Sequence, residues 1–296
     1  MRRLTYTDPD GIIYTLNDNV GAWLKPGGLL GFGMPRVAVP VQRVPYQDGA
    51  ELMGAPYMEP RELRVAVDVA KAGLDERLAY ERAMRSALSP YKDTDELGVL
   101  TIEDTGNAVT RAIACWLVEC PEPERRGPGM SVVTYTFVAP SPFFYDPDGL
   151  LESVSMSGGG ITFPLTPPIE FAGTGIDEHL DINNPGDVEV WPVIRIVADN
   201  GEDPTLENET TGKTLAITGG AGVTLDTGDY IEVDMGAATV VFYDASAGTT
   251  TSIIELLSAT SEFWSLKRGA NTLHFAMTLA TSGSFTLACY PLYVGA

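Results

Sequence analysis

Residues 263–275 read FWSLKRGANTLHF, in which two strand-like runs meet at a corner. Gly269 gives that corner a residue without a Cβ, which can adopt a positive φ at low cost. The side chain of Asn271 can hydrogen-bond back to the turn backbone. After the corner, Leu273 and Phe275 alternate with polar neighbours, as in a strand with one buried face. The stretch therefore predicts a corner that feeds apolar side chains into the core of a β-domain.

Lys267 and Arg268 precede this corner in a chain that carries 40 acidic and only 19 basic residues. A basic pair in such a chain is either a binding site or the polar approach to a turn. We favour the turn, because the glycine and the asparagine that follow account for its shape. The pair is then exposed and contributes little to folding stability.

Working outward from the corner, residues 161–296 contain short runs rich in β-branched and aromatic residues and no convincing helix. Turns separate these runs about every 8–12 residues, which is the spacing of an antiparallel sandwich. The predicted strands lie at 169–171, 190–198, 213–217, 229–235, 239–244, 271–277 and 284–290. We therefore expect a C-terminal antiparallel β-sandwich over residues 161–296.

The first half of the chain has a different pattern. Residues 63–69 alternate as a half-buried strand, and residues 74–88 carry apolar side chains at the spacing of one amphipathic helix of about four turns. Strand patterns return at 97–103, 109–120 and 131–144. These elements predict an N-terminal domain over residues 1–145, a β-sheet with one packed helix.

Residues 146–160 have the turn and glycine content of a linker between the two domains. The predicted fold class is therefore β-rich α+β, with a sheet-and-helix domain, a linker and a sandwich. The 296 residues are enough to bury two separate cores.

The formal net charge of −21 excludes several function classes. Residues 1–145 hold 15 Lys and Arg against 19 Asp and Glu, whereas residues 146–296 hold 4 against 21. Binding of nucleic acid or of an anionic membrane needs a concentrated positive surface, which this chain lacks. The chain also contains no apolar run of the roughly 18 residues that span a bilayer. We expect neither membrane insertion nor specific nucleic-acid binding.

Catalytic and cofactor motifs are missing from the sequence. There is no GxGxxG, no P-loop, no GxSxG, no HExxH and no EF-hand pattern. The two histidines, His179 and His274, stand in unrelated sequence contexts. His274 is expected to face solvent or an interface, and His179 lies among acidic residues that form the densest group of potential metal ligands. We predict no enzymatic activity, no cofactor and no metal.

Four aromatic residues leave a second function open. Trp191, Trp264, Tyr230 and Tyr243 occur in or near predicted strands, where they could form a sugar-stacking platform or pack in the core. The platform would make the protein a carbohydrate-binding module or a glycan-active protein. Core packing is the commoner reason for aromatic residues in strands.

Three short motifs carry a resemblance to a known family. Asn183, Gly186 and Pro192, with Ile194 and Ile196, fit an N-x-G…P-x-I-x-I pattern in which Gly186 can take a positive φ and Pro192 ends ladder donation. Gly212 lies in ENETTGKTL at 207–215, and Gly269 and Asn271 fit L-x-x-G-x-N-x-hydrophobic-x-F. With the two-domain pattern, these motifs resemble the distal tail protein (Dit) family of long-tailed (siphovirus) bacteriophages.

The resemblance implies a structural virion protein at the tail tip, assembled in the host cytoplasm. It implies a ring, usually a hexamer, in which N-terminal belt domains surround the DNA channel and galectin-like C-terminal domains project outward. The implied partners are the tail tube protein and the tail-tip hub, a tail-associated lysin-like protein, with a receptor-binding protein as a further candidate. DNA passes through the ring without being bound specifically.

A ring needs strands that contact neighbouring copies. We assign the interface to two strand patterns of the N-terminal domain, because a sheet with open edges can pair with another copy. The predicted interface residues are Leu63, Val65, Val67, Val132, Tyr135 and Phe137.

Overall fold

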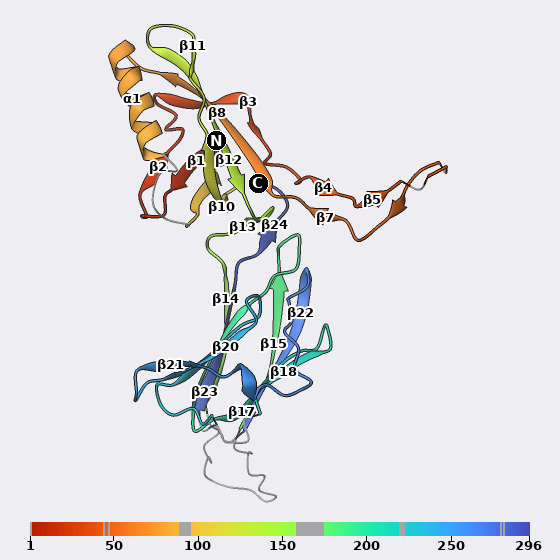
Figure 1. Cartoon of the computed structure of the whole chain (residues 1–296). Helices are drawn as coiled ribbons and strands as arrows, with labels where there is room; N and C mark the ends of the chain where they lie inside the picture. The colour runs from red at the N-terminus through yellow and green to blue at the C-terminus, as the bar shows by residue number, and fades with distance from the viewer. Residues whose placement is uncertain are drawn as a thin grey trace, which may run out of the picture. The chain divides into compact units, whose positions relative to one another are not determined.

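The computed structural model describes residues 2–43, 45–46, 48–88, 96–157, 175–218, 223–278, 280 and 282–296 (Figure 1). The chain divides into two compact units. Unit 1 comprises residues 1–147 and 293–296, and unit 2 comprises residues 148–292. The chain therefore passes from one unit to the other twice, near residue 147 and near residue 292.

The main sheet of unit 1 is antiparallel and runs in the order β2-β1-β9-β10-β12-β8-β3. Its strands are β1 (Arg2–Thr7), β2 (Ile13–Thr15), β3 (Ala22–Leu30), β8 (Arg61–Ala70), β9 (Gly98–Asp104), β10 (Val109–Glu119) and β12 (Met130–Ala139). Short strands β11 (Glu124–Arg125), β13 (Phe144–Tyr145) and β24 (Leu292–Tyr293) attach to this sheet.

The strand pattern at residues 63–69 forms β8, which pairs with β12 along ten residues. Alternate side chains of β8 are fully buried, and the residues between them are exposed or half-buried, so the period of two in the sequence corresponds to one core-facing side. Helix α1 (Leu74–Ala87) follows directly. Tyr80, Met84 and Leu88 pack on the core of unit 1, and Asp75 and Glu76 stand in the first turn, where they complement the helix dipole.

Between β3 and β8 the chain forms an arm, residues 37–58, that extends from the main sheet of unit 1 (Figure 1). Strand β4 (Val37–Ala38) pairs with β7 (Tyr57–Met58), and β5 (Val41–Gln42) pairs with β6 (Glu51–Leu52). The sequence patterns gave no prediction for this region.

Unit 2 contains two antiparallel sheets that share one core. The larger has the order β14-β23-β16-β19-β20-β21, and the smaller has the order β15-β22-β17-β18. Phe275 of the smaller sheet stacks on Phe285 of the larger, with ring centroids 5.0 Å apart. One buried cluster joins residues of both sheets, so unit 2 is a β-sandwich.

The strands of the larger sheet are β14 (Leu150–Ser157), β16 (Val193–Asp199), β19 (Tyr230–Asp234), β20 (Thr239–Asp244), β21 (Thr249–Ser252) and β23 (Ser282–Cys289). Those of the smaller are β15 (Gly175–Asn184), β17 (Glu202–Asn208), β18 (Lys213–Ala216) and β22 (Gly269–Thr278), and a 3-10 turn spans Ile254–Leu256. The predicted strand at 169–171 lies outside the described residues.

Two predicted domain limits are wrong. Residues 150–157, predicted as linker, form β14 and pair with β23 along their whole length, while 158–160 lie outside the described residues. The serine-rich sequence of β14 carries no strong strand signal. The segment is a strand because its backbone pairs with that of β23. Residues 293–296, predicted to belong to the C-terminal domain, belong to unit 1, where Arg61 Nη2 donates to Val294 O over 2.8 Å.

The predicted β-rich α+β class is confirmed, with α1 as the α-helix of the described residues. Within that part of the chain, no helix is long and apolar enough to cross a membrane.

Candidate functional site

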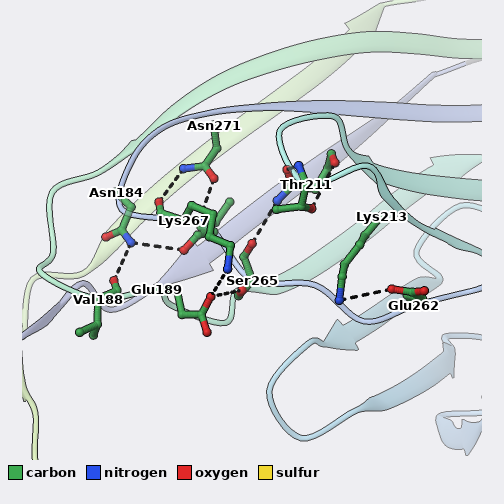
Figure 2. Close-up of polar contacts among 11 residues, drawn as sticks. Asn184, Val188, Glu189, Thr211, Lys213, Glu262, Ser265, Lys267 and Asn271 are labelled. Atoms are coloured by element: carbon green, nitrogen blue, oxygen red, sulfur yellow. Dashed lines mark hydrogen bonds and ion pairs between the residues drawn. The ribbon is translucent and has the colours of Figure 1, made fainter. Parts of the chain in front are cut away.

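A polar corner in unit 2 contains the family-like motifs. Asn184, the last residue of β15, is buried and makes three hydrogen bonds, and Figure 2 shows the one to Val188. Its Nδ2 donates to Val188 O at 3.0 Å and to Leu266 O at 3.4 Å, and its Oδ1 accepts from Gly186 N at 2.9 Å. One side chain thus shapes the turn after β15 and ties it to a segment far along the chain.

Asn271, on β22, also shapes a turn by hydrogen bonds to the backbone. Its Oδ1 accepts from Lys267 N at 2.8 Å, and its Nδ2 donates to Lys267 O and to Gly269 O, both at 2.9 Å. Gly269 adopts φ +86°, the left-handed conformation that glycine tolerates best. The carboxamide therefore closes the loop on itself, as the sequence suggested.

A third buried asparagine, Asn208, holds the same segment from β17. Its Nδ2 donates to Ser265 O at 3.1 Å, and its Oδ1 accepts from Thr211 N at 3.2 Å. Asn184, Asn208 and Asn271 together fix the backbone just before β22 by polar contacts, which add to the packing of Trp264 and Leu266 in the core. Sequence reasoning did not identify Asn184 or Asn208. The turn-forming residues that follow each of them were the available signal.

Lys267 forms an exposed ion pair at the corner. Its ammonium pairs with Glu189 Oε2 at 2.5 Å, and Ser265 Oγ donates to the same oxygen at 3.0 Å (Figure 2). The hydrogen bond from Lys267 lowers the pKa of Glu189, and that from Ser265 acts in the same direction. Both partners are about half exposed, so this ion pair stabilises the corner only weakly.

The remaining motif residues differ in their roles. Asn183 is exposed, so its neighbour Asn184 is the structural asparagine. Gly186 does not adopt a positive φ, which corrects the prediction. A Cβ there would lie 2.7 Å from Leu292 O and 2.9 Å from Leu292 N, so close backbone approach is what requires glycine. Pro192 directly precedes β16, and Gly212 adopts φ +67° in the turn between β17 and β18.

The six residues assigned to a ring interface lie in the core of unit 1. Leu63, Val65, Val67, Tyr135 and Phe137 are fully buried, and Val132 is nearly so. Their side chains pack within their own protomer, so another copy cannot contact them. The prediction failed because strand alternation identifies a buried side but does not say what buries it.

The arm presents an apolar surface that another molecule could cover. It exposes apolar side chains along both of its edges and at its tip: Val37, Val39, Val41, Tyr46, Leu52, Met53 and Tyr57. An isolated arm of paired two-residue strands has no core of its own. Contiguous exposed apolar residues of this kind mark interaction sites, because removing their surface from water is favourable.

The aromatic platform of the alternative function is not assembled. Trp264 is 0% exposed, and its Nε1 donates to Leu206 O at 3.3 Å inside the sandwich. Tyr230 stacks on Tyr243 with centroids 4.8 Å apart, and the guanidinium of Arg195 lies 3.6 Å from the centre of the Tyr230 ring. Trp191 is exposed without these partners, so the four side chains do not share one surface available to a sugar.

The two histidines are neighbours in the fold, although the sequence gave no sign of it. His179 of β15 and His274 of β22 are paired residues of the ladder, and their rings stack at 4.5 Å. Hydrogen bonding to Asp177 raises the pKa of His274 above its usual value, and burial opposes this.

The polar corner lies in a part of the chain that is similar to a known family of phage tail proteins. Residues 185–288, which include the Gly186 turn, β16 and β22, match the family model described as the siphovirus-type tail component, C-terminal domain. By sequence alone, no curated protein matches the chain.

The solved structure of the Dit protein of phage SPP1 is similar along almost the whole chain. The match covers 97% of this chain and 98% of that one, with a TM-score of 0.65 and 16% identity. That protein is described as a paradigm of the hub adsorption apparatus in phages that infect Gram-positive hosts. A chain of the phage p2 baseplate in its activated conformation matches with a TM-score of 0.50 and 11% identity, over 97% and 98% of the chains. The resemblance to the Dit family stated from the motifs is thereby confirmed.

Proposed function

We propose that the protein is a structural distal tail adaptor of a siphovirus, located at the tail tip, with no enzymatic role. The support is the family match of residues 185–288 and the Dit fold along the chain. An adaptor needs two kinds of surface, one for its own copies and one for other tail proteins. The two units provide separate bodies for these two tasks.

The observation that carries the proposal is the arm of unit 1. Its exposed apolar residues need a cover, and a neighbouring copy in a ring can supply one through the same contact at every step. We infer that unit 1 forms the ring, that six copies close it, and that the arm of each copy contacts the next.

Unit 2 then carries the attachments. Its core is closed within the sandwich, so its outer surface is free to bind partners. We propose the tail tube protein and the tail-tip hub as neighbours of the ring and a receptor-binding protein as a candidate partner of unit 2. A galectin-like identity of the sandwich remains a prediction.

Mass photometry of the purified chain, alone and with tube or hub protein, tests the adaptor function. We expect a closed particle of about six subunits, visible as a ring in negative-stain images. A chain that stays monomeric at micromolar concentration, also after addition of both partners, would rule out the ring. A glycan array provides the complementary test, because the adaptor role requires no affinity for sugar.

A further inference from the structure

The outer surface of the smaller sheet of unit 2 brings together a set of metal-ligating side chains. His179 and His274 are paired residues on the antiparallel strands β15 and β22, with an angle of 15° between their rings. Their apolar neighbours, such as Leu273 and Phe275, point to the other side and enter the core. Both imidazoles therefore lie on the solvent side of a rigid ladder.

Three carboxylates surround the pair. Asp177 Oδ1 lies 2.6 Å from His274 Nε2. Glu207 Oε2 lies 3.5 Å from His274 Nδ1, and Glu209 Oε1 lies 3.4 Å from His179 Nδ1. Each Nδ1 thus faces a glutamate. This is the arrangement in which an outer carboxylate holds an imidazole and fixes which ring nitrogen is free to bind a metal.

Asp177, His179 and His274 each offer one potential ligand atom, and these three atoms all lie within 4.8 Å of one another. A tetrahedral zinc ion with bonds of about 2.0–2.1 Å needs its ligands about 3.4 Å apart. Asp177 and His179 have exposed side chains, so small χ rotations close the difference without moving the backbone. Two imidazoles and one carboxylate are a ligand set suited to zinc and its neighbours in the transition series.

The charge of the region favours a cation. Residues 146–296 carry 21 acidic against 4 basic residues, and within the described part of the chain none of the five side chains in the cluster forms an ion pair with a lysine or an arginine. A divalent cation would be attracted to this surface. It would replace the hydrogen bond between His274 and Asp177, in which the two groups share a proton.

We propose that Asp177, His179 and His274 bind a divalent transition metal of the zinc class, with Glu207 and Glu209 orienting the two imidazoles. Strand β15 is an edge strand, held on one side only by β22. A metal bound by residues of both strands would hold β15 to β22 and so stabilise unit 2. The proposal is independent of ring formation, since all five residues belong to one protomer.

Zinc titration by calorimetry tests the site, using the full chain without a polyhistidine tag after removal of metal with EDTA. We expect saturation at one zinc per chain. His274→Gln, His179→Gln and Asp177→Asn each should weaken binding by about 100-fold or more, while Glu207→Gln should weaken it by about 10–100-fold. Asp181→Asn is the matched control, because it removes the same charge from the same side of β15 without touching the histidines and should leave affinity unchanged.

Two further readouts separate a built site from surface binding. Cobalt(II) should give the intense visible absorption of a tetrahedral complex in the wild-type chain and lose it in His274→Gln. Zinc should raise Tm, and EDTA should reverse the shift. Circular dichroism without metal checks that the variants fold. Binding of equal strength in wild-type, His274→Gln and Asp177→Asn, or no saturable binding at all, would overturn the proposal.

Discussion

Asn184 Nδ2 donates a hydrogen bond to Leu266 O, which joins residues 82 positions apart in the chain. The bond links the end of β15 to the segment that leads into β22. Asn184 is buried, so truncating it leaves the polar groups of its partners without a substitute.

We expect Asn184→Ala to destabilise unit 2 by about 2–4 kcal/mol, because three hydrogen bonds are lost at a buried position. Asn183→Ala is the matched control. Asn183 is the adjacent exposed residue, and its change should stay within about 0.5 kcal/mol. Urea denaturation of both variants measures the difference, and equal midpoints would contradict the role of Asn184.

Gly269 should tolerate substitutions according to their conformational cost and not according to their size. A Cβ at this position would meet no atom within 4 Å, so only the positive φ opposes a side chain. Gly269→Val should cost about 1–3 kcal/mol, whereas Gly269→Asn should cost clearly less, because asparagine enters the left-handed region more readily. Thermal unfolding compares the two, and an equal Tm loss would indicate a packing cause.

Lys267→Met should produce a pH-dependent loss of stability. The pKa of Glu189 is lowered below its usual 4.5 in the folded chain, so the pair with Lys267 stabilises above that pH and loses its effect as the pH falls through the folded pKa. The wild-type advantage should be under about 1 kcal/mol at neutral pH, since the pair is exposed, and should disappear in acid. Denaturation midpoints between neutral pH and pH 3 measure it.

Arg268→Met is the control for that series, because it removes the same charge one residue later without disturbing Glu189. Its effect on stability should not depend on pH in the acid range. The same acid dependence in both variants would mean that general charge, and not the Glu189 pair, is responsible.

Leu52→Glu in the arm should prevent ring assembly without unfolding the chain. Leu52 is 68% exposed in the protomer, so the change costs little there, but a charge buried against a neighbouring copy costs several kcal/mol. Leu151→Glu on β14, at 71% exposure, is the matched control and should leave the ring intact. Mass photometry and Tm are the measurements, and rings of wild-type mass with Leu52→Glu would remove the arm from the interface.

Local patterns identified α1 and many of the strands, but they missed the other strands and the limits of the two domains. The alternation of residues 63–69 and the helical spacing of residues 74–88 gave β8 and α1, because burial on one side imposes a period that the sequence must carry. In β14 the alternation spans only Ser153–Ser157 and runs into a stretch of glycines, so the segment was assigned to a linker. It forms because the backbone of β23 is available, and no local signal reports the presence of a partner strand.

The corner illustrates the same division for single residues. Gly269 and Asn271 act within one turn, so their roles follow from a few neighbouring letters. Asn184 and Asn208 act on residues that arrive from a distant part of the chain, and Gly186 is constrained by the backbone of Leu292. These roles depend on contacts that only the folded chain creates.

The sequence by itself determined the β-rich class, the helix α1, the two-unit plan and the resemblance to Dit proteins, because periodicity and turn chemistry are local. Tertiary structure alone decided that the supposed interface strands are core, that the arm exposes a row of apolar side chains and that His179 meets His274. Those three facts depend on which segments lie side by side, and strand pairing across about 95 residues, from β15 to β22, is set by the global arrangement of the sheets.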